Sequence, residues 1–361
     1  MPGVGHFSPI SPIWLAARRE TSDAAGMRAL TARPVAASIE ELLDGATARE
    51  PFLHSDSKSG VGFERVVIGG EPFILKHVHI DDDWTMRFFF ETTCIPVEVW
   101  RLGLMDALPE RIDHATVAVA AGLGRDGLGG ALLMRDVGPA MVPAGDEPLP
   151  PEHHLQLLDD MAALSARLWG WPGDPALLPP ANRWRAFNDA GIAAEEARGF
   201  PDAVPPIAKE GWARFDGRAP EPARRVVQEL RRDTRPLVEA VAATPLTFLH
   251  GDWKLGNLGI GADGRTVLLD WTYCGLGPAC FDLGWYLAIN AARLPQTKED
   301  AIAAFRAALE RHGVDTASWW DRQLGLCLLG GAVLFGWEKA FGSDDEFGWW
   351  CDRAVEGARL L

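Results

Sequence analysis

The chain has 361 residues, and its 35 lysines and arginines stand against 50 aspartates and glutamates, a formal net charge of −15. Hydrophobic residues make up 47% and charged residues 24%, an ordinary globular mixture that excludes a disordered or fibrous protein. The acidic balance repels phosphate backbones, so we expect no nucleic-acid partner. At about 150 residues per domain, the length predicts roughly two domains.

The cysteines and the apolar runs bear on location. The five cysteines are odd in number and contain no C-x-x-C pair, and the first residues show no secretory signal pattern. This usage disfavours a disulfide framework or a structural zinc site and predicts a cytoplasmic protein. The longest uncharged apolar run, residues 324–337, is shorter than the ~20 residues of a membrane helix. We therefore expect a buried helix there, and no membrane partner.

The first third of the chain predicts a β-rich unit. Residues 1–37 are rich in Pro, Ala and Arg and predict a loose arm. Two β-type runs, residues 63–68 and 72–76, flank Gly69-Gly70 and predict a hairpin. A helix is expected over residues 84–104, which Pro96 can break. Two more strands are expected at residues 115–121 and 131–134.

After Gly138 the pattern becomes helical. A proline-rich connection leads into a helix expected over residues 152–169, and further helical pieces run to about Thr244. Three short β-type runs follow, at residues 246–249, 258–260 and 266–269. The remainder predicts helices, one of which begins at a capping box on Thr297 and ends before Gly313.

One stretch of the chain carries the chemistry. Residues 250–257 read H-G-D-W-K-L-G-N, and Asp270 follows the strand expected at residues 266–269. Phosphoryl transfer needs one carboxylate facing the attacking hydroxyl, and an amide oxygen and a second carboxylate to hold Mg²⁺. Taken singly, His250 reads as a core histidine and the other residues as turn residues. Turn chemistry does not require this spacing, so the ordered set favours a catalytic loop.

With these motifs the sequence resembles the aminoglycoside phosphotransferase and choline kinase-like family, relatives of the protein kinases. The resemblance implies a two-lobed α+β fold with a small β-rich N-lobe (residues 38–134), a hinge (135–137) and a larger, mainly helical C-lobe (138–361). It implies an ATP- and Mg²⁺-dependent kinase that transfers the γ-phosphoryl group to a hydroxyl of a small acceptor. The acceptor would be an aminoglycoside, an amino alcohol or a sugar-like molecule.

The resemblance also assigns roles to residues. Asp252 would be the catalytic carboxylate, and Asn257 and Asp270 the magnesium ligands. Lys76, at the end of F-I-L-K, would contact the α- and β-phosphates. Its orienting carboxylate would be Glu98, with Glu91 as the alternative.

Further assignments concern the nucleotide and the catalytic loop. The loop at residues 57–62, with Ser59 and Gly60, would cover the phosphates through its backbone amides. The Arg135 carbonyl and the Val137 amide would meet the adenine edge. Gly251 stands where protein kinases have the arginine of H-R-D, which favours a constitutively competent small-molecule kinase. Asp282 would brace the catalytic loop.

Several alternatives remain. Residues 122–127 fit G-x-G-x-x-G, but a strand pattern follows them, so we predict a hairpin loop and not a dinucleotide site. His77 and His79, before Asp81–Asp83, resemble a metal cluster, which would suit a metallohydrolase, although a solvated loop is favoured. A protein kinase is disfavoured because no A-P-E signature follows Asp270. A catalytically silent nucleotide-binding regulator of the same fold is the main alternative. Most of the 15 tryptophans are expected in the core, and a few could line an acceptor pocket.

Overall fold

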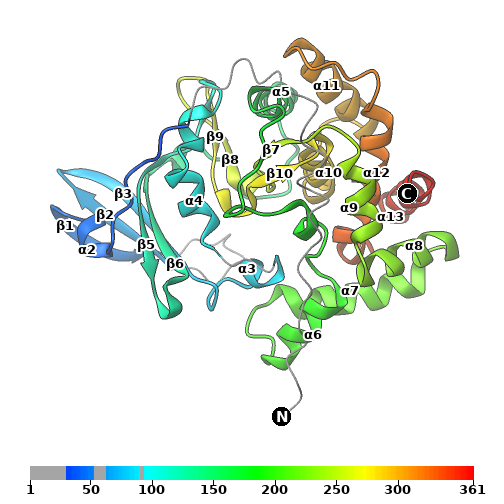
Figure 1. The fold of residues 1–361 in the computed structure, drawn as a ribbon, viewed down its shortest axis with the longest axis horizontal. Coiled ribbons are helices and arrows are strands. Elements are labelled where there is room, and N and C mark those ends of the chain that lie inside the picture. The colour runs from blue at the N-terminus through cyan, green and yellow to red at the C-terminus, as the bar shows by residue number, and fades with distance from the viewer. Residues whose placement is uncertain (1–29, 53–61, 90–92) are drawn as a thin grey trace.

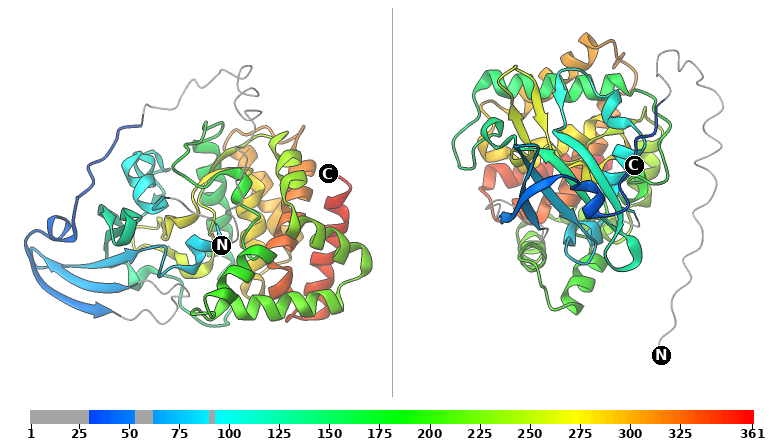
Figure 2. Two further views of the ribbon diagram at one scale, coloured as in Figure 1. Left: turned by 60° about the horizontal axis from the view of Figure 1, so that its bottom comes forward. Right: turned by 90° about the vertical axis from the view of Figure 1, so that its left-hand side faces the viewer.

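The computed structural model describes residues 30–52, 62–89 and 93–361. It has two parts, a sheet at one end and a larger bundle of helices at the other (Figure 1). The left view of Figure 2 shows the same separation from a second direction.

The N-lobe is a five-stranded antiparallel sheet in the order β1-β2-β3-β6-β5. Its strands are β1 (Ala46–Phe52), β2 (Phe63–Ile68), β3 (Glu71–Val78), β5 (Thr116–Leu123) and β6 (Gly129–Arg135). Ile68 pairs with Glu71, and both Gly69 and Gly70 have positive φ, which confirms the predicted two-residue hairpin. The G-x-G-x-x-G stretch joins the antiparallel strands β5 and β6, so it is the predicted hairpin loop.

Alternation along β3 sends Lys76 toward the C-lobe. Leu75 belongs to a small core cluster that packs against α2 (Ile39–Leu42), on one face of the sheet. Val78 belongs to the large core that extends through the C-lobe. Because successive side chains of a strand point to opposite faces, Lys76 shares the face of Val78.

The single helix expected over residues 84–104 is two helices. These are α3 (Trp84–Phe88) and α4 (Ile95–Arg101). Pro96 lies in the first turn of α4, where its missing N–H costs no helix hydrogen bond, so it starts this helix instead of breaking a longer one. Helix α4 packs against β5, β6 and the 3-10 helix η6 (Trp271–Tyr273).

The C-lobe is built around α12. Its helices are α5 (Pro151–Arg167), α6 (Asp189–Ala197), α7 (Val204–Arg218), α8 (Glu221–Arg232), α9 (Arg235–Ala242), α10 (Ala279–Ile289), α11 (Lys298–Arg311), α12 (Trp320–Lys339) and α13 (Asp344–Ala358). Helix α12 contains the apolar run at residues 324–337, contacts α7, α8, α9, α10 and α13, and is almost entirely buried, as predicted. Thr297 caps α11 by accepting a hydrogen bond from the Asp300 N–H, which confirms the capping box.

Further short strands lie outside the five-stranded sheet. They are β4 (Ile112–Asp113), β7 (Thr247–Leu249), β8 (Leu258–Ile260), β9 (Thr266–Leu268) and β10 (Gly275–Gly277). β10 pairs with β7, and β9 lies between β4 and β8. All five cysteines are buried, and no two of them form a disulfide. Across the described part of the chain, no helix is long and apolar enough to cross a membrane.

Candidate active site

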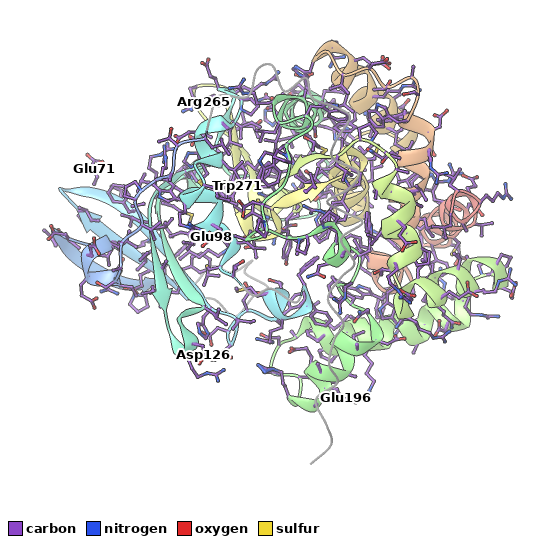
Figure 3. All side chains as sticks on the ribbon, viewed as in Figure 1. Glu71, Glu98, Asp126, Glu196, Arg265 and Trp271 are labelled. Atoms are coloured by element: carbon purple, nitrogen blue, oxygen red, sulfur yellow. The ribbon has the colours of Figure 1, made fainter. Side chains whose placement is uncertain are left out.

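The short strands bring together Asp252, Asn257 and Asp270, the residues predicted to act in catalysis and in magnesium binding. The loop after β7 carries Asp252 and Asn257, and Asp270 follows β9. The Leu269 N–H donates to the Asn257 carbonyl at 2.9 Å, which ties the residue before Asp270 to the catalytic loop. Figure 3 labels Trp271, the residue after Asp270, between the sheet and the helical lobe.

The Asp252 carboxylate is held at both oxygens. Trp285 Nε1 donates to Oδ1 at 2.9 Å, and Asn257 Nδ2 donates to Oδ2 at 2.8 Å. Lys254 Nζ lies 3.5 Å from Oδ2. Burial raises the pKa of Asp252 above its usual value, although the charge of Lys254 works in the opposite direction. The carboxylate is therefore fixed in orientation and is more basic than an exposed aspartate.

Asp270 sits in strained backbone beside a cation. Its φ is +63°, in the left-handed region that non-glycine residues rarely adopt. Lys76 Nζ lies 2.9 Å from Oδ1, and the Thr272 hydroxyl donates to the same oxygen at 2.6 Å. Burial alone would raise the pKa of Asp270, but the charges of Lys76 and Lys254 outweigh it and hold that pKa well below its usual range. Asp270 is thus a carboxylate throughout the physiological pH range.

The structure confirms the brace predicted for Asp282. Its oxygens accept hydrogen bonds from the backbone N–H groups of His250 and Gly251, at 3.2 and 2.9 Å, and from Trp253 Nε1 at 3.0 Å. Burial raises the pKa of Asp282 to about 6, against the opposing charge of Arg183. Gly251 has φ +87°, and a Cβ there would lie 2.5 Å from the Tyr273 carbonyl oxygen. An arginine at this position of the loop is therefore excluded by space.

His250 is a structural residue of the catalytic loop. Its Nε2 faces the Leu269 carbonyl at 3.0 Å, and its Nδ1 accepts the Asp252 N–H at 3.2 Å. These partners require a neutral ring with the proton on Nε2. Burial lowers the pKa of His250 to about 3, which agrees with a neutral ring.

The pairing predicted for Glu98 differs from the one in the structure. Glu98 lies on α4, beside η6, but its carboxylate binds Arg101 one turn along the helix, with Arg101 Nε at 2.8 Å (Figure 3). Within the described chain, Lys76 pairs with Asp270. An arginine three residues along the same helix reaches Glu98 without any movement of the lobes, which explains the local pair. The alternative, Glu91, lies outside the described residues.

Four further residues were predicted to bind the nucleotide, and two of them lie in the described part of the chain. Arg135 ends β6, where it pairs with Phe73 of β3, and its guanidinium binds Asp113. Val137 precedes the 3-10 helix η3 (Gly138–Ala140). Ser59 and Gly60 lie outside the described residues.

Lys254 and Trp285 belong to the site, although the sequence interpretation assigned them no part in it. Lys254 has Asp252 and Asp270 as its charged neighbours, and their attraction raises its pKa against the effect of burial. Its position two residues after Asp252 could have signalled a cation beside the catalytic carboxylate. Trp285 comes from α10, and its distance along the sequence from the motif follows no known pattern.

The donor set fits a magnesium ion. Asn257 uses its amide nitrogen on Asp252, which directs its amide oxygen elsewhere, and both hydrogen bonds to the Asp270 carboxylate end on Oδ1. One amide oxygen and one carboxylate oxygen match the few protein ligands that Mg²⁺ takes beside phosphates. No group of three or more His, Cys, Asp or Glu side chains in residues 30–52, 62–89 and 93–361 could hold a metal unaided. His77 instead contacts Glu64, and His79 contacts the Arg125 carbonyl, so the metallohydrolase alternative loses its cluster.

Comparison with known proteins identifies the class. The sequence model of the phosphotransferase enzyme family matches residues 58–319, more than half of the chain, so the protein belongs to this family. No protein of curated function matches the sequence. The resemblance predicted from the motifs is thereby confirmed.

Three solved structures are similar to this chain at low sequence identity. A microcompartment-associated aminopropanol kinase is 16% identical, with a TM-score of 0.51 over 88% of this chain and 96% of that chain. A choline kinase from Streptococcus pneumoniae is 12% identical, with a TM-score of 0.49 over 89% and 96%. A putative fructosamine-3-kinase from Haemophilus somnus is 10% identical, with a TM-score of 0.43 over 88% and 92%. The predicted α+β, protein-kinase-like fold is correct.

Proposed function

We propose that this phosphotransferase is a small-molecule kinase, which moves the γ-phosphoryl group of ATP to a hydroxyl of an amino alcohol, an aminoglycoside or a sugar-like acceptor. The observation that carries the proposal is the joint placement of Asp252, Asn257 and Asp270 facing Lys76 from the other lobe. Each of these residue types answers a requirement of phosphoryl transfer.

The nucleotide end of the site is formed by cations and by oxygen ligands. Lys76 would bind the α- and β-phosphates after leaving Asp270, which now neutralises it at 2.9 Å. Asn257 and Asp270 would hold Mg²⁺, which offsets charge on the β- and γ-phosphates. Lys254 lies beside Asp252, so it is the cation next to the point of transfer. The adenine and phosphate-loop roles of Arg135, Val137, Ser59 and Gly60 form part of the same proposal.

The acceptor end depends on Asp252. Its carboxylate would accept the proton of the acceptor hydroxyl while the new O–P bond forms and the bond to the departing ADP breaks. Because Trp285 and Asn257 fix both of its oxygens, little reorganisation is needed at the moment of transfer. Its raised pKa makes it a better proton acceptor than an exposed aspartate.

Aromatic rings lie next to this carboxylate. Trp285 packs with Tyr273 at a centroid distance of 5.7 Å, and Phe89 of the N-lobe lies 4.3 Å from the Tyr273 ring. Such rings favour an acceptor with an apolar or cationic face. A catalytically silent regulator is less well supported, because such a protein has no need of this complete set of oriented groups.

The test is ADP release from Mg·ATP against a panel of acceptors. The panel contains choline, aminopropanol, fructosamine, hygromycin B, spectinomycin, free sugars and macrolides. We expect one class to give acceptor-dependent ADP release, and Asp252→Ala to lose nearly all of it. A panel without any acceptor-dependent release, in a protein that binds Mg·ATP, would favour the silent regulator.

A further inference from the structure

A buried arginine lies under the segment that follows Asp270. Arg183 comes from the stretch between η4 (Pro180–Asn182) and α6, and its side chain is fully enclosed. Among the described residues no carboxylate forms an ion pair with it, yet burial lowers its pKa only to about 10, so it is charged at neutral pH. We propose that Arg183 is a positioning residue, which holds the segment after Asp270 against the catalytic loop. The inference rests on the proposed function.

The contacts of Arg183 point to that segment. Nε donates to the Leu276 carbonyl at 2.8 Å, and Nη1 donates to the Tyr273 carbonyl at 3.2 Å. The guanidinium also lies 5.1 Å from the Phe281 ring centroid. Two backbone carbonyls, three residues apart, are thus fixed by one rigid donor group. Tyr273 is the last residue of η6, the turn that begins directly after Asp270.

The same guanidinium faces the catalytic loop. Asp282, which binds the N–H groups of His250 and Gly251, is the carboxylate whose charge acts most strongly on Arg183. The Tyr273 carbonyl that Arg183 binds is also the atom nearest to a Cβ built at Gly251. Arg183 therefore binds the segment after Asp270 directly, and it interacts with the loop of Asp252 through the charge of Asp282.

The neighbouring backbone is shaped around this side chain. A Cβ at Gly277 would lie 2.6 Å from Arg183 Nε, so only glycine lets β10 pass so close. Gly251 of the catalytic loop lies close to the Tyr273 carbonyl that Arg183 binds. Protein kinases have arginine at this position of the loop. The cation under the segment after Asp270 comes here from outside the loop, from the insertion between α5 and β7.

Energetics favour a functional reason for this charge. Burying an ion costs several kcal/mol, and apolar side chains of similar volume often replace buried charges at no loss of stability. Nη2 of Arg183 has no hydrogen-bond partner within the described chain, which adds to the cost. A methionine would fill the space at lower cost but would release the two carbonyls.

The experiment is ATP titration, with and without Mg²⁺, of the full chain and of Arg183→Met. We expect ATP affinity in Mg²⁺ to fall about tenfold, the scale of one or two lost buried hydrogen bonds, while affinity without Mg²⁺ stays unchanged. Arg183→Lys keeps the positive charge and one donor nitrogen, so it should recover part of the lost affinity. Gly277→Ala places a Cβ 2.6 Å from Arg183 Nε and 2.5 Å from Leu249 Cδ1, so it should disturb the guanidinium together with β7. We expect it to repeat the loss, and it serves if Arg183→Met does not fold.

Arg231→Met is the matched control. Arg231 is also buried, lies over the Trp212 ring at 3.9 Å and pairs with Asp189, away from the catalytic loop. We expect this variant to lose thermal stability and keep the magnesium dependence of ATP binding. Equal behaviour of the Arg183 and Arg231 variants would overturn the positioning role.

The titration, together with the ADP-release assay, separates the two proposals. Wild-type protein that binds ATP with Mg²⁺ but transfers no phosphoryl group would contradict the kinase proposal, and the Arg183 comparison would still decide positioning. Wild-type protein that binds no ATP would overturn both.

Discussion

At the scale of residues, a tryptophan orients the Asp252 carboxylate. Trp285 donates its single N–H to Asp252 Oδ1, and its ring packs against Tyr273, Phe281 and Phe335. The indole therefore orients the Asp252 carboxylate and also packs in the aromatic cluster beside it. Since only one of its two roles involves the N–H, the two can be separated by substitution.

Trp285→Phe removes the N–H and keeps an aromatic ring. We expect kcat to fall about tenfold to a hundredfold, because a hydrogen bond to a charged group contributes roughly 1.5–3 kcal/mol. The affinity for Mg·ATP should stay unchanged, as measured by titration. Trp350→Phe, which removes the N–H bound to Glu346 on α13, is the control and should retain kcat. Similar kcat values in both variants would refute the orienting role.

The residue scale also shows where sequence patterns succeed. The motif predicted the carboxylates and the amide because Asp252, Asn257 and Asp270 lie in one short stretch whose strands fold back on themselves. The bracing role of Asp282 could be predicted equally well, since Asp282 lies in the first turn of α10, the next helix along the chain. Arg183 and Trp285 could not be predicted, because each reaches the site by packing from a distant element. The orienting role of Glu98 stays a prediction: in the structure Glu98 pairs with Arg101, and a pair with Lys76 would depend on the orientation of α4 relative to β3, which no sequence pattern gives.

At the scale of elements, α3 attaches the N-lobe to the helical lobe. Trp84 and Phe88 pack on Phe187, with ring centroids 5.6 and 5.1 Å apart. Arg87 of the same helix binds Glu195 of α6 at 2.7 Å and Asp202 at 2.8 Å. Glu195 is 3% exposed, so this ion pair is buried. The segment after β3 is therefore anchored in α6 and its C-terminal connection.

Arg87→Met tests this anchor. Arg87→Met removes the residue that binds both oxygens of the buried Glu195 carboxylate and leaves Arg198 Nε 3.8 Å from Oε1. We therefore expect the unfolding free energy to fall by about 3 kcal/mol in urea denaturation. Adding Glu195→Gln should restore part of the loss. Arg225→Met, which breaks an exposed pair with Glu221, should change stability by less than about 0.5 kcal/mol. A loss in Arg87→Met no larger than in this control would contradict the anchor.

Elements with a strong local pattern were predictable, and elements defined by their partners were not. The hairpin at Gly69-Gly70 and the buried helix α12 follow from turn chemistry and from apolar length. β1 was missed because it is a charged edge strand, exposed through its centre and containing Pro51. β10 is three residues long, two of them glycine, and is a strand only because β7 lies beside it.

At the scale of the whole molecule, two buried histidines contribute to the response of stability to acid. His250 and His154 are fully enclosed, and burial lowers their pKa values to about 3 and about 4. Their pKa values in the unfolded chain are about 6.5, so the unfolded state binds more protons below that pH. Their contribution to stability is present above pH 6.5 and is lost as pH falls toward 4 and 3.

Each histidine should cost about 2 kcal/mol of unfolding free energy between pH 7 and pH 5. Asp282 opposes them, because its folded pKa is raised and its protonation on the way down favours the folded state by roughly 1 kcal/mol. We therefore expect a net loss of about 3 kcal/mol in urea denaturation at pH 5. His154→Phe should remove about 2 kcal/mol of this pH dependence. A His154→Phe protein with the wild-type pH dependence would refute the assignment.

In the proposed reaction two carboxylates have separate roles: Asp252 would serve the acceptor, and Asp270 would serve the magnesium ion and the nucleotide. The direct measurement is calorimetric titration of ATP, with and without Mg²⁺, into wild type, Asp252→Asn and Asp270→Asn. The account predicts wild-type affinity for Asp252→Asn, and for Asp270→Asn a loss of the magnesium-dependent part of binding, about tenfold or more. Equal loss in both variants, or undiminished magnesium dependence in Asp270→Asn, would contradict it.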